Sequence, residues 1–532
     1  MILSKIDTLI ILGYMSLMLV MGYFLGKDNK DQEDYFLAGR SMSWFPVGLS
    51  IAATMISCNA FIGGPGWGYE QGLLPFMQNI AVPLSLFISV TIFTPVLYNL
   101  KLTSVYEYIE LRLGKSTRIV TVIAFLMNSL IQVSSMVFIP ALVLQRFTGI
   151  DITLIIPVIV IIAIIYTLMG GIKAVIWTDA IQMLVIWGGV LGGIIYTFSI
   201  SGVGLFETFS MAVESGKLNA IDLSINTSLF DANGAIVALV GGSVMWLRYF
   251  AFDQAQVQRM NTSKSIKDLK RSFVISGILM NTLYFIFILL GALLFIQFGG
   301  IEFANANDVM IKFIGDLPVG LIGVLLAGLF AAAMSSVDSI LNSMSTVFIK
   351  DIYEKYISKE QEASLKVSML ISLMWGIIIV ILTVLAFSST TQSILSVIGN
   401  YISYISGPSC GVFLLAMLTK KANDKGTAIG AVLGFIFVLV FGNTVGLTWM
   451  WNSAVGMIAT FGFGYIASIL IQEEVSEEKL KYTLIGYRKK LIEEGNTTED
   501  GVSLLPFHVD KYGYILLGFF VLQYIILMII AR

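Results

Sequence analysis

A short run of small and polar residues could bind a cation inside an otherwise apolar part of the chain. Residues 57–59 read Ser-Cys-Asn, and the stretch 63–68 that follows holds four Gly and one Pro. Such a run cannot remain a regular α-helix, because Pro lacks a backbone N–H and clashes with the preceding turn. A break would free backbone carbonyls, which recur as cation ligands within membranes. The alternative is an exterior turn, which explains Gly66 and Gly68 better than it explains 53–58.

A stripe of small and hydroxyl-bearing residues is the second candidate cation-binding feature. Its members are spaced i, i+3, i+4, i+7 and i+11, which places them on one helix face: Ala332, Ser335, Ser336, Ser339 and Ser343. A single Ser in such a helix usually packs closely or bonds back to its own backbone. Two adjacent hydroxyls opposite broken backbone are different. Na⁺ is a hard cation, and carbonyls with hydroxyls supply oxygen ligands without burying several charges.

Arg248 is the one Lys or Arg that lies more than two residues inside the ends of a predicted membrane span. A guanidinium there costs at least about 2.5 kcal/mol unless it is paired or hydrated, so it indicates function. It is either an anchor for a substrate carboxylate or other anion, or a gate or structural pair with Asp253 or with a row of backbone carbonyls near the cavity. The neighbouring Trp246, Tyr249 and Phe250 could stack on a sugar ring or serve packing.

The composition indicates a membrane protein. Of 532 residues, 57% are hydrophobic and 12% are charged, and the mean hydropathy is +0.87. Soluble domains are about a quarter charged, so successive apolar runs must lie in lipid. A net charge of −2 provides no basic field for nucleic acid, so the expected partners are the lipid bilayer and small solutes. Two cysteines and one histidine exclude a disulfide framework and a His/Cys zinc site.

Fourteen segments are long and apolar enough to span the membrane as helices. They lie near 6–25, 44–72, 73–99, 117–147, 152–169, 175–200, 236–252, 273–298, 318–344, 365–387, 391–419, 426–445, 449–471 and 511–531. The loops on one side hold 26 Lys and Arg and those on the other side hold five. Because cytoplasmic loops carry the excess of cations, both termini are predicted to be extracellular or periplasmic in a cell-membrane protein.

The longest polar stretch, 472–511, contains no nucleotide-binding loop and no metal-ligand spacing. We interpret it as a solvated cytoplasmic linker. ATP therefore has no visible route into the mechanism, and uphill transport would need an ion gradient. No nucleophile–base pair or metal cluster indicates an enzyme.

Four motifs resemble the sodium:solute symporter family, and they follow the family's order over nearly the whole chain. They are 34–40 (Asp-Tyr-Phe-Leu-Ala-Gly-Arg), 166–179 (from Tyr-Thr-Leu-Met-Gly-Gly to Trp-Thr-Asp), 253–259 (Asp-Gln-Ala-Gln-Val-Gln-Arg), and 331–342 (from Ala-Ala-Ala-Met-Ser-Ser to Asn) together with 351–353. The last predicted helix, 511–531, makes the chain similar to the sodium/galactose branch, and other features are similar to the bacterial sialic acid branch.

The resemblance implies an all-α integral membrane fold with a leucine-transporter-type 5+5 inverted repeat, an extra N-terminal helix and extra C-terminal helices. The implied division is an N-terminal helix and cytoplasmic loop (1–43), a first repeat (44–200), an extracellular loop (201–235), a second repeat (236–419), two accessory helices (420–471), a cytoplasmic linker (472–510) and a C-terminal helix (511–532).

The resemblance also implies ion sites. The family's principal sodium site would use the carbonyls of Ala53, Ile56 and Ala332 with the hydroxyls of Ser335 and Ser336. Asp179, at the start of a predicted span, is either a helix-start carboxylate favoured by the helix dipole or part of an exit path or second sodium site. The sialic acid branch pairs the matching Asp with two hydroxyls, and those positions here are Asp338 and Ser339. Since a carboxylate replaces one hydroxyl here, the number of sodium ions transported per solute is not carried over from that branch.

Neither branch's solute pocket is reproduced in this sequence. Positions where the galactose branch contacts sugar are Ala60, Met280 and Gly399, and the sialic acid branch's carboxylate-binding Arg is replaced by Gln132. The polar side chains predicted to bind the solute instead are Asn59, Gln78, Asn79, Gln132, Arg248, Tyr249 and Asn400.

The predicted function is sodium-coupled import of a polar organic solute, a sugar or an acidic sugar such as sialic acid, by alternating access. The alternatives are symport of another organic anion or small nutrient (a monocarboxylate, amino acid or vitamin), a transporter-like sensor, or a channel. A channel would need a continuous polar path, and a sensor would need a fused output domain for which 472–511 is too short.

Overall fold

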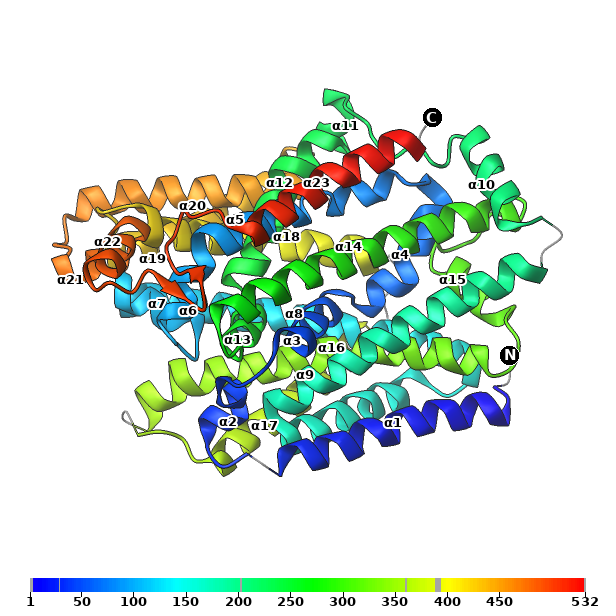
Figure 1. Cartoon of the computed structure of the whole chain (residues 1–532), viewed down its shortest axis with the longest axis horizontal. Coiled ribbons are helices and arrows are strands. Elements are labelled where there is room, and N and C mark those ends of the chain that lie inside the picture. The colour runs from blue at the N-terminus through cyan, green and yellow to red at the C-terminus, as the bar shows by residue number, and fades with distance from the viewer. Residues whose placement is uncertain (1–2, 28, 201–202, 359–360, 388–393, 531–532) are drawn as a thin grey trace.

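The computed structural model of the chain describes residues 3–27, 29–200, 203–358, 361–387 and 394–530. Apart from one short hairpin, the regular secondary structure in these ranges is helical (Figure 1). The elements of the first half are α1 (Lys5–Gly26), α2 (Gln32–Leu37), η1 (Ala38–Arg40), α3 (Trp44–Met55), α4 (Cys58–Gln71), η2 (Leu74–Asn79), α5 (Val82–Ile88), η3 (Ser89–Phe93), α6 (Thr94–Asn99), α7 (Val105–Arg112), α8 (Lys115–Thr148), α9 (Ile152–Ile200), α10 (Leu205–Glu214) and α11 (Ile225–Phe230).

In the second half, two membrane helices are each followed by a π-helical segment: η4 follows α12, and η5 follows α16. Its elements are α12 (Ala235–Leu247), η4 (Arg248–Phe252), α13 (Gln254–Asn261), α14 (Ile266–Gln297), α15 (Asp308–Gly315), α16 (Leu321–Val347), η5 (Phe348–Ile357), α17 (Leu365–Phe387), α18 (Ile394–Leu418), α19 (Asp424–Thr444), α20 (Met450–Ile471), α21 (Glu477–Leu480), α22 (Leu484–Glu493), β1 (Thr498–Glu499), β2 (Val502–Ser503) and α23 (Lys511–Ile530).

The described residues form eleven helices long and apolar enough to cross a membrane, or up to twelve if the bent pair α3–α4 is one span. The fourteen predicted spans differ from this count in two places. Spans 152–169 and 175–200 are joined in α9, which is kinked at Gly171, where φ is 58° and ψ is −161°. Span 391–419 corresponds to α18, whose first turns adjoin residues outside the described ranges.

The predicted span 44–72 is broken, but the break lies before its glycines. α3 ends at Met55, α4 begins at Cys58, and the two helices are bent by 59°. The prediction that the Gly/Pro run leaves the helix is wrong, because 63–68 lies inside α4. The glycines instead allow close packing on α14, since a Cβ on Gly68 would lie 1.9 Å from the carbonyl oxygen of Ile288.

The helix that carries the hydroxyl stripe, α16, lies in the interior of the protein. Almost every residue from Leu325 to Val347 is buried, and α16 packs against α3, α8 and α9. The side chains of Ser335, Ser336 and Ser339 are 0% exposed. The stripe therefore faces other parts of the protein rather than lipid, as polar side chains in membrane helices generally do.

Residues 472–510, here called the C-terminal strap, are docked on the protein. The strap contains a hairpin, β1–β2, in which Asp500 and Gly501 have φ values of 50° and 72°, as a two-residue type I′ turn requires. Glu499 Oε2 accepts hydrogen bonds from the Ile266 backbone N–H at 2.7 Å and from Tyr98 Oη at 3.2 Å. The hairpin thus joins α6 and the N-terminus of α14.

Other bonds fix the strap at both ends. Lys270 Nζ on α14 donates to Asp510 Oδ2 at 2.7 Å, and Tyr108 Oη on α7 donates to the Tyr482 carbonyl at 2.8 Å. Lys479 Nζ donates to the Leu113 carbonyl at 2.6 Å. The segment is therefore not a free linker, although many of its side chains are exposed: its polar residues bond to the Ile266 N–H, the Leu113 carbonyl and the Tyr98 hydroxyl.

We predict that Glu499→Ala releases the strap hairpin. The change removes a charged acceptor from two donors, and hydrogen bonds to charged groups contribute about 1.5–3 kcal/mol. Trypsin should cleave the purified protein near Arg488 roughly ten times faster, because cleavage follows the population of the opened segment. The control is Glu494→Ala, which removes only a 3.9 Å pair with Lys490. Equal cleavage of the two variants would contradict this description of the docking.

Candidate functional site

The backbone at the end of α3 faces side-chain hydroxyls from two other helices. Ser335 Oγ donates to the Ala53 carbonyl at 3.2 Å, and Ser336 Oγ reaches the Thr54 carbonyl at 3.5 Å. On the opposite helix, Tyr284 Oη of α14 donates to the Met55 carbonyl at 3.3 Å. Three successive backbone carbonyls, those of residues 53–55, thus accept hydrogen bonds from side-chain hydroxyls.

The local backbone explains why these carbonyls are available. Ile56 ends α3 with φ −85° and ψ 82°, and Ser57 follows in an extended conformation. The Ser57 carbonyl then accepts the N–H groups of Ala60 and Phe61, which starts α4. Because the chain changes direction between the two helices, the last carbonyls of α3 lose the i+4 donors that a continuous helix would supply.

Four of the five oxygens predicted to bind sodium, those of Ala53, Ala332, Ser335 and Ser336, lie together. Ser335 Oγ and Ser336 Oγ also lie 3.3 and 3.2 Å from the Ala332 carbonyl, so the hydroxyls stand between α16 and the end of α3. A cation with ligands at about 2.3–2.6 Å needs neighbouring oxygens about 3.3–3.7 Å apart at right angles, close to the spacing here. Ile56 is buried at the break itself. Sodium binding by this set remains a prediction.

A buried charge cluster lies beside the hydroxyl stripe. Arg259 Nη2 pairs with Asp179 Oδ2 at 2.9 Å, and both side chains are 0% exposed. Arg259 Nε donates to Ser50 Oγ at 2.7 Å, and Arg259 Nη2 also donates to Ser339 Oγ. The helix-start interpretation of Asp179 is wrong, because Asp179 lies inside α9, well beyond the kink at Gly171.

Asp338 gives this cluster a second carboxylate. Tyr166 Oη donates to Asp338 Oδ2 at 2.5 Å, and Ser339 Oγ lies 3.1 Å from Asp338 Oδ1. Asp338 is 0% exposed, and Asp179 Oδ1 has no hydrogen-bond partner among the described residues. Of the two buried carboxylates, Asp179 pairs with the guanidinium and Asp338 bonds to hydroxyls, and an unbalanced buried charge is costly. The arrangement favours a further cation or proton here.

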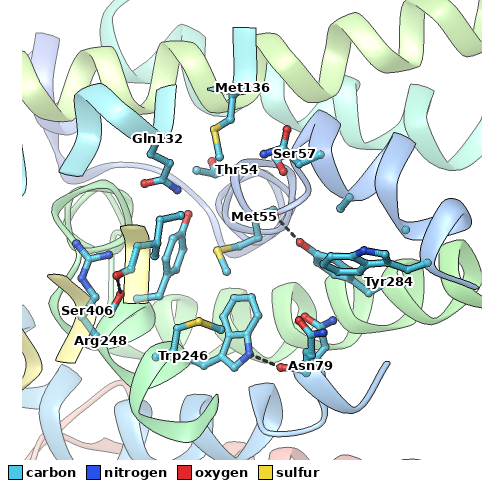
Figure 2. A pocket seen from close by; sticks show the side chains of 18 of the residues that line it. Thr54, Met55, Ser57, Asn79, Gln132, Met136, Trp246, Arg248, Tyr284 and Ser406 are labelled. Atoms are coloured by element: carbon cyan, nitrogen blue, oxygen red, sulfur yellow. Dashed lines mark hydrogen bonds between the residues drawn. The ribbon is translucent and has the colours of Figure 1, made fainter. Parts of the chain in front are cut away.

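A cavity of about 200 Å³ adjoins the break and is lined by Thr54, Met55 and Ser57 together with residues from seven other elements and Trp449, which precedes α20 (Figure 2). Six of the seven residues predicted to bind the solute line it: Asn59, Gln78, Asn79, Gln132, Arg248 and Tyr249. The seventh, Asn400, lies outside the side chains that the structure describes. The other lining residues are Ala60, Gly64, Trp67, Met136, Met245, Trp246, Tyr284, Ile288, Ile402, Ser406 and Trp449.

Existing contacts already hold several of these polar groups in place. Gln78 Nε2 donates to Asn233 Oδ1 at 2.8 Å, and Trp246 Nε1 donates to the Gln78 carbonyl at 3.0 Å. Arg248 Nη1 lies 2.9 Å from Asp253 Oδ2, with the two side chains 4% and 7% exposed. The pair with Asp253 was one of the two interpretations of Arg248, and the structure adds that Arg248 also lines the cavity.

Sequence reasoning missed the role of Arg259 and the cavity's aromatic wall. Arg259 stands in one of the family-like motifs, but 253–272 reads as a cytoplasmic loop, so its burial was not expected. A lone cation among the uncharged residues of 254–261 was the available signal. Trp67 lies on α4, Tyr284 on α14 and Trp449 just before α20, and no local pattern in the sequence brings them together.

Comparisons with known proteins agree with one another. A sequence model described as the Sodium:solute symporter family matches residues 35–434. The Sodium/sialic acid symporter SiaT of Proteus mirabilis is 28% identical, covering 87% of this chain and 95% of that protein. The Sodium/glucose cotransporter of Vibrio parahaemolyticus is 30% identical, covering 82% and 85%.

A solved structure of a sodium-coupled transporter is also similar to this chain. It is a Na⁺-coupled sialic acid symporter in a substrate-bound outward-open state, described as revealing a novel Na⁺ site. Its TM-score to this chain is 0.79 at 27% identity, covering 88% of this chain and 98% of that one. The two chains therefore share one overall architecture.

We predict that Arg259→Gln strongly destabilises the protein. The change leaves the buried Asp179 and Asp338 without their guanidinium, and breaking a buried pair by removing one partner costs roughly 3–5 kcal/mol. Denaturant unfolding in detergent should show this loss. The control is Lys264→Gln, whose side chain is 57% exposed in an i,i+4 pair with Asp268, and which should change stability little. Similar stability of the two variants would show that the buried cluster is not balanced by Arg259.

Proposed function

The chain belongs to the sodium:solute symporter family, and from that premise we propose that it imports a sugar or an acidic sugar, such as sialic acid, together with Na⁺. Transport is secondary active: the sodium gradient supplies the driving force. One observation supports this assignment most directly, namely the hydroxyls of α16 facing the free carbonyls at the end of α3.

The proposed sodium ligands are the carbonyls of Ala53, Ile56 and Ala332 and the hydroxyls of Ser335 and Ser336. Their burial supports this, because a cation stripped of water needs a full set of oxygens to replace its hydration. Their neutrality supports it too, since one monovalent ion can be bound without burying several charges.

Coupling between ion and solute is proposed to pass through the break. Thr54 and Met55 place their carbonyls toward hydroxyls, and the same two residues line the cavity. A cation that orders this backbone therefore also orders one wall of the solute site. By linkage, sodium raises solute affinity by the factor by which solute raises sodium affinity.

We propose a second ion position or exit path at Asp179, Asp338 and Ser339. The excess of one carboxylate over the guanidinium of Arg259 supports it, as does the unpartnered oxygen of Asp179. This position lies on the same face of α16 as Ser335 and Ser336, so an ion leaving the first set would meet it next.

The proposed architecture is a 5+5 inverted repeat of fourteen spans, with repeats at 44–200 and 236–419 that rock about the midplane site. The extra parts are the helix and loop 1–43, the loop 201–235, the accessory helices 420–471, the strap 472–510 and the C-terminal helix 511–532. The paired helix breaks support it: α3–α4 opens the first repeat, and α12 meets a π-turn and then α13 in the second.

Both termini are proposed to lie on the extracellular or periplasmic side of the cell membrane. The excess of Lys and Arg in alternate loops supports this orientation. The start of α1 and the end of α23 lie toward one end of the molecule, and α2, α7, α21 and α22 lie toward the other (Figure 1).

The solute assignment draws on the relatives and on the cavity. Similar proteins include a sodium/sialic acid symporter and a sodium/glucose cotransporter. The amides of Gln78, Asn79 and Gln132 could bond sugar hydroxyls, and Trp246 and Tyr249 could stack on a ring. The alternative is another organic anion or small nutrient. We propose a transporter role rather than an enzymatic, channel or sensor role.

We predict that Ser336→Ala raises the sodium concentration for half-maximal uptake by about tenfold or more, because losing one bond to a charged partner costs about 1.5–3 kcal/mol. Uptake in proteoliposomes against sodium concentration measures it, with protein level checked separately. The control is Ser343→Ala, on the same helix face, whose hydroxyl has one partner among the described residues, the Ser339 carbonyl at 2.8 Å. Unchanged sodium dependence in Ser336→Ala would refute the site assignment.

A further inference from the structure

Arg248 has hydrogen-bonding capacity that the protein leaves unused. The residue is 3% exposed and lines the cavity. Its Nη1 lies against Asp253, while its Nε is buried with no hydrogen-bond partner among the described residues. A guanidinium presents five N–H donors and no acceptor. Since a buried N–H without a partner is unfavourable, the group is suited to a ligand that supplies acceptor oxygens.

Asp253 can release Arg248 without losing its structural role. Its Oδ2 faces Arg248, but its Oδ1 accepts the Ala255 backbone N–H at 2.9 Å and so caps the N-terminus of α13. The two oxygens thus serve different partners. If another carboxylate took Arg248, the cap on α13 would remain.

The cavity has one charged end. Arg248 is the one Asp, Glu, Lys or Arg side chain among the described residues that line it. In Figure 2, Gln132, Arg248 and Ser406 lie on one side of the cavity, Asn79 and Tyr284 on the other, and Met55 between them. The intervening walls are apolar or aromatic, including Trp246 and Met136. Such a site favours a solute with one anionic group and a less polar body.

Resting on the proposed function, we infer that the transported solute carries a carboxylate, which binds Arg248 in competition with Asp253. The planar guanidinium fork matches a carboxylate through two parallel N–H bonds. Charge also favours the inference, because a carboxylate and one Na⁺ enter the protein together without adding net charge. A neutral hexose has no carboxylate, so it would offer the unused N–H donors of Arg248 hydroxyl oxygens alone as acceptors.

The competition would also connect the cavity with the buried charge cluster. Asp253 caps α13, and the same short helix carries Arg259, which pairs with Asp179 beside the hydroxyl stripe. A solute carboxylate that frees Asp253 therefore acts on the helix that balances the charges near the ion. This is a second physical link between solute and ion, separate from the backbone of 53–57.

A solute panel tests the inference on the full chain in proteoliposomes with an inward sodium gradient. The acids are N-acetylneuraminate, pyruvate and benzoate, and the neutral solutes are pyruvamide, benzamide and galactose. We expect sodium-driven uptake of at least one acid and roughly tenfold weaker uptake of its amide, because a site built for a charged group rejects the analogue that lacks it. Galactose uptake equal to that of every acid would overturn the inference.

Failure of the proposed function has a different signature. It would appear as uptake that is the same with sodium, lithium or potassium gradients. In that case the contrast between acid and amide would still report on Arg248. Uptake of none of the panel would overturn the inference of a carboxylate solute as stated.

Two variants separate a solute-binding role from a structural pair. Arg248→Gln should raise the half-saturating concentration of the acid by about tenfold or more. Asp253→Asn should lower it, because the competitor loses its charge while the amide oxygen can still cap α13. A purely structural pair would impair both variants alike, and that outcome would overturn the inference. A sodium-dependent thermal shift in each variant checks that the ion site is folded, and Arg248→Lys should give an intermediate value.

Discussion

The structure depends on one requirement, that backbone carbonyls inside a membrane protein find partners. Ending α3 at Met55 frees three carbonyls at a depth where each unsatisfied group costs several kcal/mol. The hydroxyls of Ser335, Ser336 and Tyr284 meet them, which requires α16 and α14 to lie against the break. The arrangement that stabilises the broken helix thus also brings together oxygens that we propose as sodium ligands.

Burial of charge is the second constraint. Asp179, Asp338 and Arg259 lie beside the same stripe, and Arg248 and Asp253 pair at the cavity. The two groups are joined by α13, which Asp253 caps and on which Arg259 lies. The proposed solute cavity and the proposed ion positions therefore share the backbone of 53–57 and the short helix α13. Neither link requires a long chain of intermediate residues.

Much of the site could be predicted because its parts are local in sequence. The hydroxyl spacing on α16 fixes one helix face, and six of the predicted polar residues line one cavity. The position of the break was harder, because Gly and Pro weaken helices on average, whereas here glycines serve packing of α4 on α14. Arg259 and the strap could not be foreseen, since their partners lie far away in the sequence and charged residues near predicted helix ends resemble solvated loops.

The most direct test of the central claim is a pair of high-resolution structures determined in sodium and in choline. The account predicts density in sodium alone, within coordination distance of the Ala53 and Ala332 carbonyls and of the Ser335 and Ser336 hydroxyls. The same structures would contradict it if the end of α3 and this face of α16 stood apart in sodium, or if the space between them held no ion.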